Sequence, residues 1–207
     1  KKDLASTAVE AVDLANTIGY PVVLKIDSKD IPHKTEANGI RLKIQNDHEV
    51  TEAFADILDS AKKYNPDAQI AGVSVHEMLP KGTEIIVGVT NDSAFGPVIM
   101  FGLGGIFVET FKDISFRVAP LTKQDAAEMI EEIKGKAILK GVRGQGPADL
   151  EAIMNVLLNV SDLVMEAEGK IEELDINPII VYEKGVKAAD ALIVAASSVL
   201  EKTEAGR

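Results

Sequence analysis

The sequence predicts an α+β fold of two lobes, and three features of its 207 residues lead to this prediction. Helix-like and strand-like segments alternate over the first 79 residues, whereas several strand-like segments follow one another directly after them. Turns rich in glycine, proline and asparagine separate these later segments, as in antiparallel hairpins. We expect a small lobe over residues 1–79 and a large lobe over residues 80–207, with a ligand bound between the two.

The small lobe is predicted from two segments with helical spacing of apolar residues and from three β-branched runs. The helices are expected over residues 5–18 and 46–65, and the strands over residues 20–26, 39–44 and 70–79. The apolar stripe of the first helix comprises Val9, Val12, Ala15 and Ile18.

The large lobe is predicted to contain more strands than helices. Strands over residues 84–90 and 96–101 follow the strand over 70–79 after short turns, so we expect the three to form antiparallel hairpins. Further strands are expected over residues 114–119, 171–181 and 186–196, helices over 122–133 and 149–167, and glycine-rich loops over 102–105 and 141–147.

Composition limits the function. Hydrophobic residues make up 46% of the chain and aromatic residues only 4%, so the core must be aliphatic. The absence of cysteine excludes a disulfide framework, a thiolate metal site and a cysteine nucleophile. Since no apolar run could span a bilayer and the start is not signal-like, we expect a cytoplasmic protein without membrane contacts. With 33 acidic and 22 basic residues, the net charge of −11 would repel nucleic acid and argues against such a partner.

Phosphate binding is predicted on one strand and the loop that follows it. The sequence has no P-loop motif and no dinucleotide-binding glycine motif after a strand. Lys25 lies near the exit of the strand over 20–26, and His33, Lys34 and Gly39 follow on the next loop. A lysine ammonium and the N–H groups near a glycine suit phosphate oxygens. Without these neighbouring residues, we would interpret Lys25 as a side chain that extends from a strand edge and has no binding role.

Oxygen ligands gather near the C-terminus. Alternation puts Glu173, Asp175 and Asn177 on one face of a strand. If residues 184–185 form a two-residue hairpin loop, Asp190 lies opposite Ile179 and diagonal to Asn177 on that face. Hard oxygen ligands with room for phosphates suit Mg²⁺. The alternative is a solvated acidic strand face.

The three histidines differ in their settings. His48 is expected in the first turn of a helix, exposed to solvent, and His76 in an alternating strand with a structural role. His33 lies in a polar loop positioned by the strand of Lys25, where spacing alone favours an ordinary loop residue.

Several motifs in the same order resemble the nucleotide-binding subunit of ADP-forming acetyl-CoA synthetases. The matching segments are residues 19–26, 30–35, 95–109, 113–120, 141–144 and 173–178, so the resemblance extends from Gly19 to Val194. The pair Asn177 and Asp190 is also similar, more distantly, to the metal site of the succinyl-CoA synthetase β subunit. The resemblance implies an ATP-grasp fold, with the nucleotide between its two lobes.

The resemblance also implies site roles, with ATP or ADP and Mg²⁺ as cofactors. Lys25 would contact the nucleotide phosphates, Glu77 and Met78 the adenine, and Glu84 the ribose. Asn177 and Asp190 would hold Mg²⁺. His33 would carry the phosphoryl group, with Asp175 orienting it or sharing the metal, and Arg117 near the transferred phosphate.

The implied activity is an acetate–CoA ligase (ADP-forming) that needs a second protein or domain. A CoA-binding α subunit, or a fused domain, would carry a first phosphohistidine, in an α2β2-type assembly. Two alternatives remain: a nucleotide-sensing region of a protein acetyltransferase, and an ATP-grasp ligase that activates a carboxylate directly. Asn38 replaces a glycine usual in the family, and the family's N-terminal helical segment is missing, which predicts a trimmed subunit or a fragment of a fused synthetase.

Overall fold

The computed structural model describes residues 2–105, 112–141 and 146–196. Parts of two segments named above lie outside these ranges, namely residues 106–109 of the motif 95–109 and residues 142–145 of the glycine-rich loop 141–147. The chain divides into two units, Lys1–Pro80 and Lys81–Arg207, and each is described by itself.

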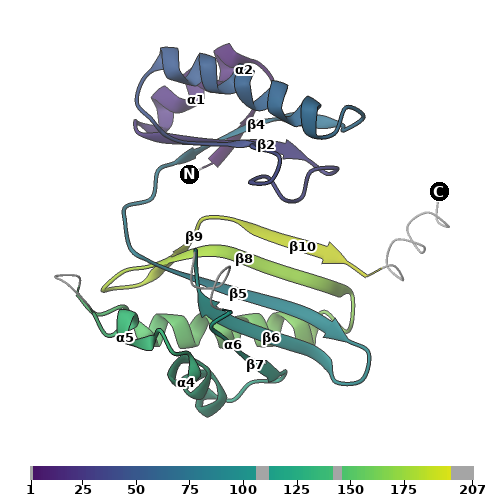
Figure 1. Cartoon of the computed structure of the whole chain (residues 1–207), viewed down its shortest axis with the longest axis vertical. Helices are drawn as coiled ribbons and strands as arrows, with labels where there is room; N and C mark the ends of the chain where they lie inside the picture. Colours follow the sequence, from purple (N-terminus) through teal and green to yellow (C-terminus); the bar gives the residue numbers. More distant parts are fainter. Residues whose placement is uncertain (1, 106–111, 142–145, 197–207) are drawn as a thin grey trace. The chain divides into compact units, whose positions relative to one another are not determined.

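The first unit is a four-stranded antiparallel sheet with two helices (Figure 1). The strands lie in the order β1-β4-β2-β3. Side chains of Thr7 and Asn46 accept hydrogen bonds from the first turns of the two helices and so fix where these begin. The elements are β1 (Lys2–Ala5), α1 (Ala8–Ile18), β2 (Val22–Ser28), β3 (Ile40–Ile44), α2 (Asp47–Tyr64) and β4 (Ile70–Glu77).

Both helices of the first unit cover the same face of its sheet. Alternate residues of β2, namely Val22, Leu24 and Ile26, are fully buried against them. Val73 and Val75 of β4 join this core. The residues between them, including Lys25, therefore point to the opposite face, which we call the helix-free face of the first sheet.

The second unit is an antiparallel sheet with helices on one face (Figure 1). Its main strand order is β10-β8-β5-β6-β7, and β9 also pairs with β8. The strands are β5 (Thr83–Asp92), β6 (Gly96–Leu103), β7 (Ile114–Val118), β8 (Ile171–Val181), β9 (Val186–Ala188) and β10 (Ala191–Ala195). The helices are α4 (Lys123–Glu132), α5 (Lys136–Leu139) and α6 (Leu150–Glu166).

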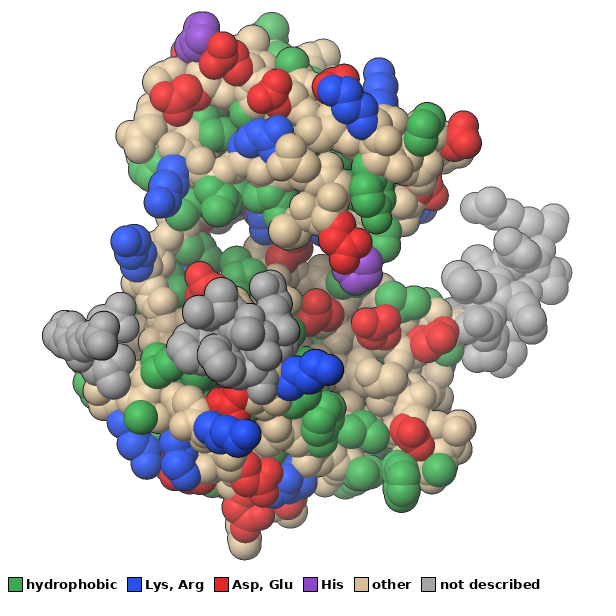
Figure 2. Space-filling view, in the orientation of Figure 1, with side chains coloured by type: hydrophobic (Ala, Val, Ile, Leu, Met, Phe, Trp, Pro, Cys, Tyr) green, Lys and Arg blue, Asp and Glu red, His purple; other side chains and the backbone are tan. Residues whose placement is uncertain are grey.

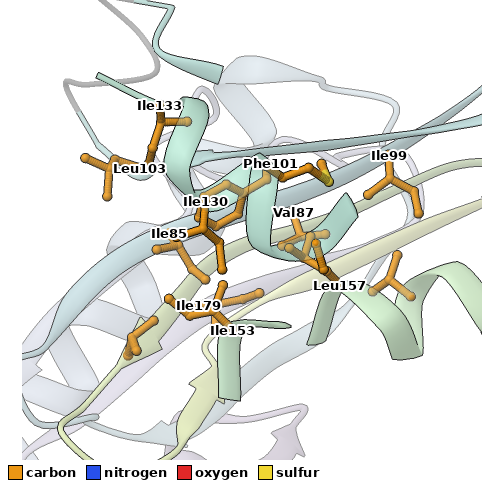
Figure 3. Close-up of a cluster of buried hydrophobic side chains, with 14 of the residues drawn as sticks. Ile85, Val87, Ile99, Phe101, Leu103, Ile130, Ile133, Ile153, Leu157 and Ile179 are labelled. Carbon is orange, nitrogen blue, oxygen red and sulfur yellow. The ribbon is translucent and has the colours of Figure 1, made fainter. Parts of the chain in front are cut away.

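The core of the second unit is aliphatic, as composition predicts. Figure 3 shows Ile85 and Val87 of β5 with Phe101 of β6 against Ile153 and Leu157 of α6. Each of these side chains is fully buried. Alternate residues of β5 and β8 thus face the helices. Among the described residues, no helix of this unit covers the other side of the sheet. We call this side the helix-free face of the second sheet.

Several sequence-based expectations about secondary structure need correction. β4 pairs with β1 and β2 and not with β5, so the first predicted hairpin is wrong, whereas the β5–β6 hairpin is confirmed. The short elements β1 and α5 were not predicted, and the strand expected over 186–196 is two strands, β9 and β10. In the apolar stripe of α1, Val9 is exposed and Ala11 is buried instead.

No helix in the described ranges is long and apolar enough to cross a membrane. On the face drawn in Figure 2, the coloured lysine and arginine side chains lie scattered among acidic ones and form no continuous basic surface.

Candidate functional site

Lys25 is buried although it does not belong to the hydrophobic core. It lies in the middle of β2, between the core residues Leu24 and Ile26, and points to the helix-free face of the first sheet. The residue nevertheless has only 7% relative exposure. A buried ammonium needs compensating polar or charged groups, so Lys25 is not the solvated surface lysine of the alternative interpretation.

The predicted adenine residues lie at one end of the strand pair that carries Lys25. Val22 pairs with Glu77, and the Met78 amide donates a hydrogen bond of 3.2 Å to the Pro21 carbonyl. Three residues of extended strand separate this point from Lys25, a length of about 10 Å. Glu77, the last residue of β4, and Met78 after it therefore lie about 10 Å from Lys25 along the strand direction. They are close in sequence to Pro80, where the first unit ends.

The loop with His33 leaves β2 at the other end. β2 ends at Ser28, three residues and about 10 Å beyond Lys25. Two apolar residues of the loop, Ile31 and Ala37, are buried in the core of the first unit. His33 is exposed between these two anchors, and Lys34 beside it is partly buried.

Gly39 has a packing role in this loop. A Cβ atom at this position would lie 2.5 Å from Ile26 Cγ2 and 3.1 Å from the Lys34 carbonyl oxygen. Its amide donates to the Lys34 carbonyl at 2.8 Å, and its carbonyl accepts from the Ile26 amide at 2.8 Å. The N–H of Gly39 is thus used inside the loop, and the contribution of Gly39 to phosphate binding stays a prediction.

The predicted metal ligands lie at an irregular point of β8. Val87 of β5 pairs with Ile176 and Ile85 pairs with Ile179, so two residues of β8, Asn177 and Pro178, face the single residue Ile86. Such β-bulges redirect side chains and are common near active sites. Asn177 is exposed at this bulge.

Asp190 lies directly opposite Asn177, which corrects the predicted register. The pairs Val181–Val186 and Ala191–Ile176 bracket this position, and the Asn177 amide donates to the Asp190 carbonyl at 3.2 Å. The prediction had Asp190 opposite Ile179, a difference of two residues.

The cause is the turn between β8 and β9, which has four residues, 182–185, where two were expected. The Asp149 carboxylate accepts a hydrogen bond of 2.7 Å from the Gly185 amide, and the Asp149 amide donates to the Tyr182 carbonyl at 2.9 Å. The start of α6 thus holds the wider turn in place.

Asp175, Asn177 and Asp190 offer two carboxylates and one amide oxygen. Asp175 precedes Asn177 by two residues on β8 and pairs with Gly88 and Leu192. Among the described residues, no group of three or more His, Cys, Asp or Glu is arranged to hold a metal. A hard cation that keeps positions for phosphate oxygens, such as Mg²⁺, suits this small set of oxygen donors.

Glu84, the predicted ribose ligand, lies at the start of β5. It is exposed, whereas the next residue, Ile85, is buried in the core. Its backbone carbonyl accepts a hydrogen bond of 2.8 Å from the Gly104 amide. Glu84 thus also fixes the beginning of the first glycine-rich loop.

Arg117 is not brought to the face that carries Asp175. It pairs with Ile99 on the edge strand β7, so it points to the helix-covered side. Its guanidinium donates to the Glu132 carboxylate at 2.9 Å and lies 3.4 Å from Glu128, both on α4. The hydrogen bonds to Glu132 raise the pKa of Arg117. We correct the expectation that Arg117 lies near the transferred phosphate: it attaches α4 to β7.

Ser74, which was not predicted as a site residue, pairs with Lys25 and is also buried. Ser74 lies in the middle of the strand expected over residues 70–79, and no motif around it indicates a functional role. Only the pairing of β2 with β4 reveals it.

Comparison with known proteins identifies the family. A sequence model of the ATP-grasp domain matches residues 1–195. The chain belongs to the ATP-grasp family. Its mixed helices and sheets are those of the ATP-grasp fold, so the predicted α+β fold class is confirmed.

Similar proteins place this ATP-grasp chain with ADP-forming acetate–CoA ligases, as the sequence resemblance predicted. The β subunit of ADP-forming acetate–CoA ligase I from Pyrococcus furiosus is 50% identical over 191 residues, which are 92% of this chain and 82% of that subunit. ADP-forming acetate–CoA ligase I from Archaeoglobus fulgidus is 44% identical over 191 residues, which are 92% of this chain but only 28% of that longer protein. The name of the Pyrococcus protein implies an α partner in that enzyme.

A solved structure has the same fold. Acetyl-coenzyme A synthetase 1 from Candidatus Korarchaeum cryptofilum, in complex with coenzyme A and Ca-AMPCP, superposes with a TM-score of 0.90 at 44% identity. The match covers 95% of this ATP-grasp chain and 85% of that one.

Proposed function

We propose that this chain is the nucleotide-binding part of an ADP-forming acyl-CoA synthetase and transfers a phosphoryl group between His33 and ADP. The observation that carries the proposal is the order of groups along β2 and β4: Glu77 and Met78 at one end, Lys25 in the middle, and the loop with His33 at the other. A nucleotide poised for transfer needs the same order of partners: groups for the adenine, then a group for the phosphates, and then the residue that exchanges the phosphoryl group.

Each unit carries groups suited to a part of the nucleotide. In the first unit, Lys25 would neutralise phosphate oxygens, with Lys34 adding charge at the loop. In the second unit, Asp175, Asn177 and Asp190 would hold Mg²⁺, and Glu84 would bind the ribose. When bound, Mg²⁺ supplies positive charge that offsets the phosphates and fixes their orientation.

The transfer needs little covalent chemistry from the protein. In the direction of ATP synthesis, an oxygen of the ADP β-phosphate attacks phosphorus, the P–N bond to His33 breaks, and the imidazole nitrogen keeps the electron pair. In reverse, that nitrogen attacks the γ-phosphorus and ADP leaves. Catalysis then depends on position and on charge stabilisation by Lys25, because the transition state spreads negative charge over the phosphoryl oxygens.

The chain requires a partner for the complete reaction. We propose that a CoA-binding α subunit, or an equivalent fused domain, forms the acyl phosphate, takes its phosphoryl group on a histidine and passes it to His33. The name of the Pyrococcus relative supports such a partner, and an α2β2-type assembly is the form we expect.

Nucleotide binding by the chain alone tests the proposal. Titration calorimetry with Mg-ADP should show a roughly 10- to 100-fold weaker affinity for Lys25→Met, since a hydrogen bond to a charged group is removed and the apolar stem is kept. Lys62→Met, in the last turn of α2, is the matched control and should bind like the wild type. Equal affinities of all three proteins would contradict the proposal.

A further inference from the structure

Two polar side chains lie beside Lys25 on the helix-free face of the first sheet. Ser74 pairs with Lys25 across β2 and β4, and His76 pairs with Val23, so His76 is a diagonal neighbour of Lys25. Ser74 is 8% exposed and His76 is partly buried. Buried polar groups are costly unless they are hydrogen-bonded, so their partners show what they do.

The hydrogen bonds connect these side chains to the backbone of Lys25. The Ser74 hydroxyl donates to the Lys25 carbonyl at 3.2 Å. His76 Nε2 lies 2.8 Å from Ser74 Oγ. In the tautomer with the proton on Nε2, the imidazole donates to the hydroxyl, and a chain of hydrogen bonds runs from imidazole to hydroxyl to carbonyl.

We propose that Ser74 and His76 are positioning residues for Lys25. Holding the carbonyl of Lys25 fixes the plane of the following peptide, and with it the direction in which the lysine side chain leaves the strand. A lysine side chain loses rotamer entropy when it is fixed, so a rigid base lowers the cost of directing its ammonium at phosphates. The inference rests on the proposed function, in which Lys25 contacts the nucleotide phosphates.

A purely structural role would have a different signature. If the chain of hydrogen bonds only satisfies buried groups, its removal lowers the stability of the first unit and leaves nucleotide affinity unchanged. If it positions Lys25, its removal weakens nucleotide binding, and this effect disappears once the ammonium itself is gone.

The test is a double-mutant cycle on the Mg-ADP affinity of the whole chain, measured by titration calorimetry. Ser74→Ala and His76→Leu should each weaken binding by roughly 3- to 10-fold, the effect of one neutral hydrogen bond. In the Lys25→Met background, neither substitution should weaken it further. His76→Gln, whose amide can still donate to Ser74, should retain most of the affinity.

His48→Gln is the matched control, because His48 lies on the surface of α2 beside Glu52. Should Ser74→Ala not fold, His76→Leu provides the same comparison with the buried serine in place. Unchanged affinity in both single variants, or an equal loss in both backgrounds, overturns the inference. If Lys25→Met alone has no effect, the proposed function fails as well, so the two failures can be told apart.

Discussion

Replacement of Gly39 by alanine tests the packing role of this residue. The new Cβ would lie 2.5 Å from Ile26 Cγ2 and 3.2 Å from Ile26 Cβ. Carbon atoms in contact prefer about 3.5–4.0 Å, so one neighbour must move by about 1 Å. Ile26 is fully buried and cannot move without disturbing the core of the first unit.

Two effects of Gly39→Ala oppose each other. Overpacking a core costs typically about 1–3 kcal/mol. The loss of backbone freedom in the unfolded chain returns about 0.4–1 kcal/mol. We therefore expect a net loss of about 1–2 kcal/mol in the free energy of unfolding, measured by urea denaturation followed by circular dichroism.

A second substitution makes this test specific. Leucine has no Cγ2 branch on its Cβ, so Ile26→Leu should remove the closest contact. Gly39→Ala together with Ile26→Leu should then cost less than the sum of the two single changes. A neutral or stabilising Gly39→Ala, or strictly additive costs, would refute the packing argument.

Three further predictions concern the second unit. Arg117→Met should lower the free energy of unfolding by about 1 kcal/mol or less, since its ion pair with Glu132 is partly exposed, and should leave Mg-ADP affinity unchanged in calorimetry. Asp190→Asn should raise the Mg²⁺ concentration needed for half-maximal ADP binding by roughly 10-fold or more. Hydrogen bonds from the backbone, first that of Gly185, hold the pKa of Asp149 below its ordinary value. The stability that Asp149 contributes is therefore present above its unfolded pKa of about 3.9 and is lost as the pH falls through its folded pKa. We expect Asp149→Asn to make the free energy of unfolding less dependent on pH on the acid side.

Matched variants separate these effects from general damage. Asp162→Asn, on the exposed side of α6, is the control for both aspartate changes. A weaker Mg-ADP affinity in Arg117→Met would return Arg117 to the phosphate site. An unchanged Mg²⁺ requirement in Asp190→Asn would remove Asp190 from the metal site, and an unaltered acid profile in Asp149→Asn would exclude its proposed effect.

Local patterns predicted most elements because they depend on spacing alone. Val50, Phe54, Ile57, Leu58 and Ala61 recur at helical spacing, and all of them are buried on α2 except Leu58, which is partly buried. The β5–β6 hairpin followed from two alternating runs with a short turn. α1 was placed correctly although its buried stripe is offset, because Ala11 and Ala15 are buried whereas Val9 is exposed.

Pairing between distant strands could not be predicted in the same way. The true register of β8 against β9 and β10 depends on the contact between Asp149 and Gly185, which are 36 residues apart. Likewise, the side of the sheet to which Arg117 points follows from its pairing with Ile99. The residues named for the site were identified by type and family motif, whereas Ser74 and His76 became visible only through the pairing of β4 with β2.

Phosphorylation of His33 is the most direct measurement of the central claim. The chain is incubated with Mg²⁺ and ATP labelled in the γ-phosphate, and the label is then located by its chemical stability and by peptide mapping. We predict an acid-labile, base-stable label on the peptide that contains His33, present in His48→Ala, absent from His33→Ala, and removed by added ADP with formation of labelled ATP. Equal labelling of His33→Ala and the wild type would contradict the account.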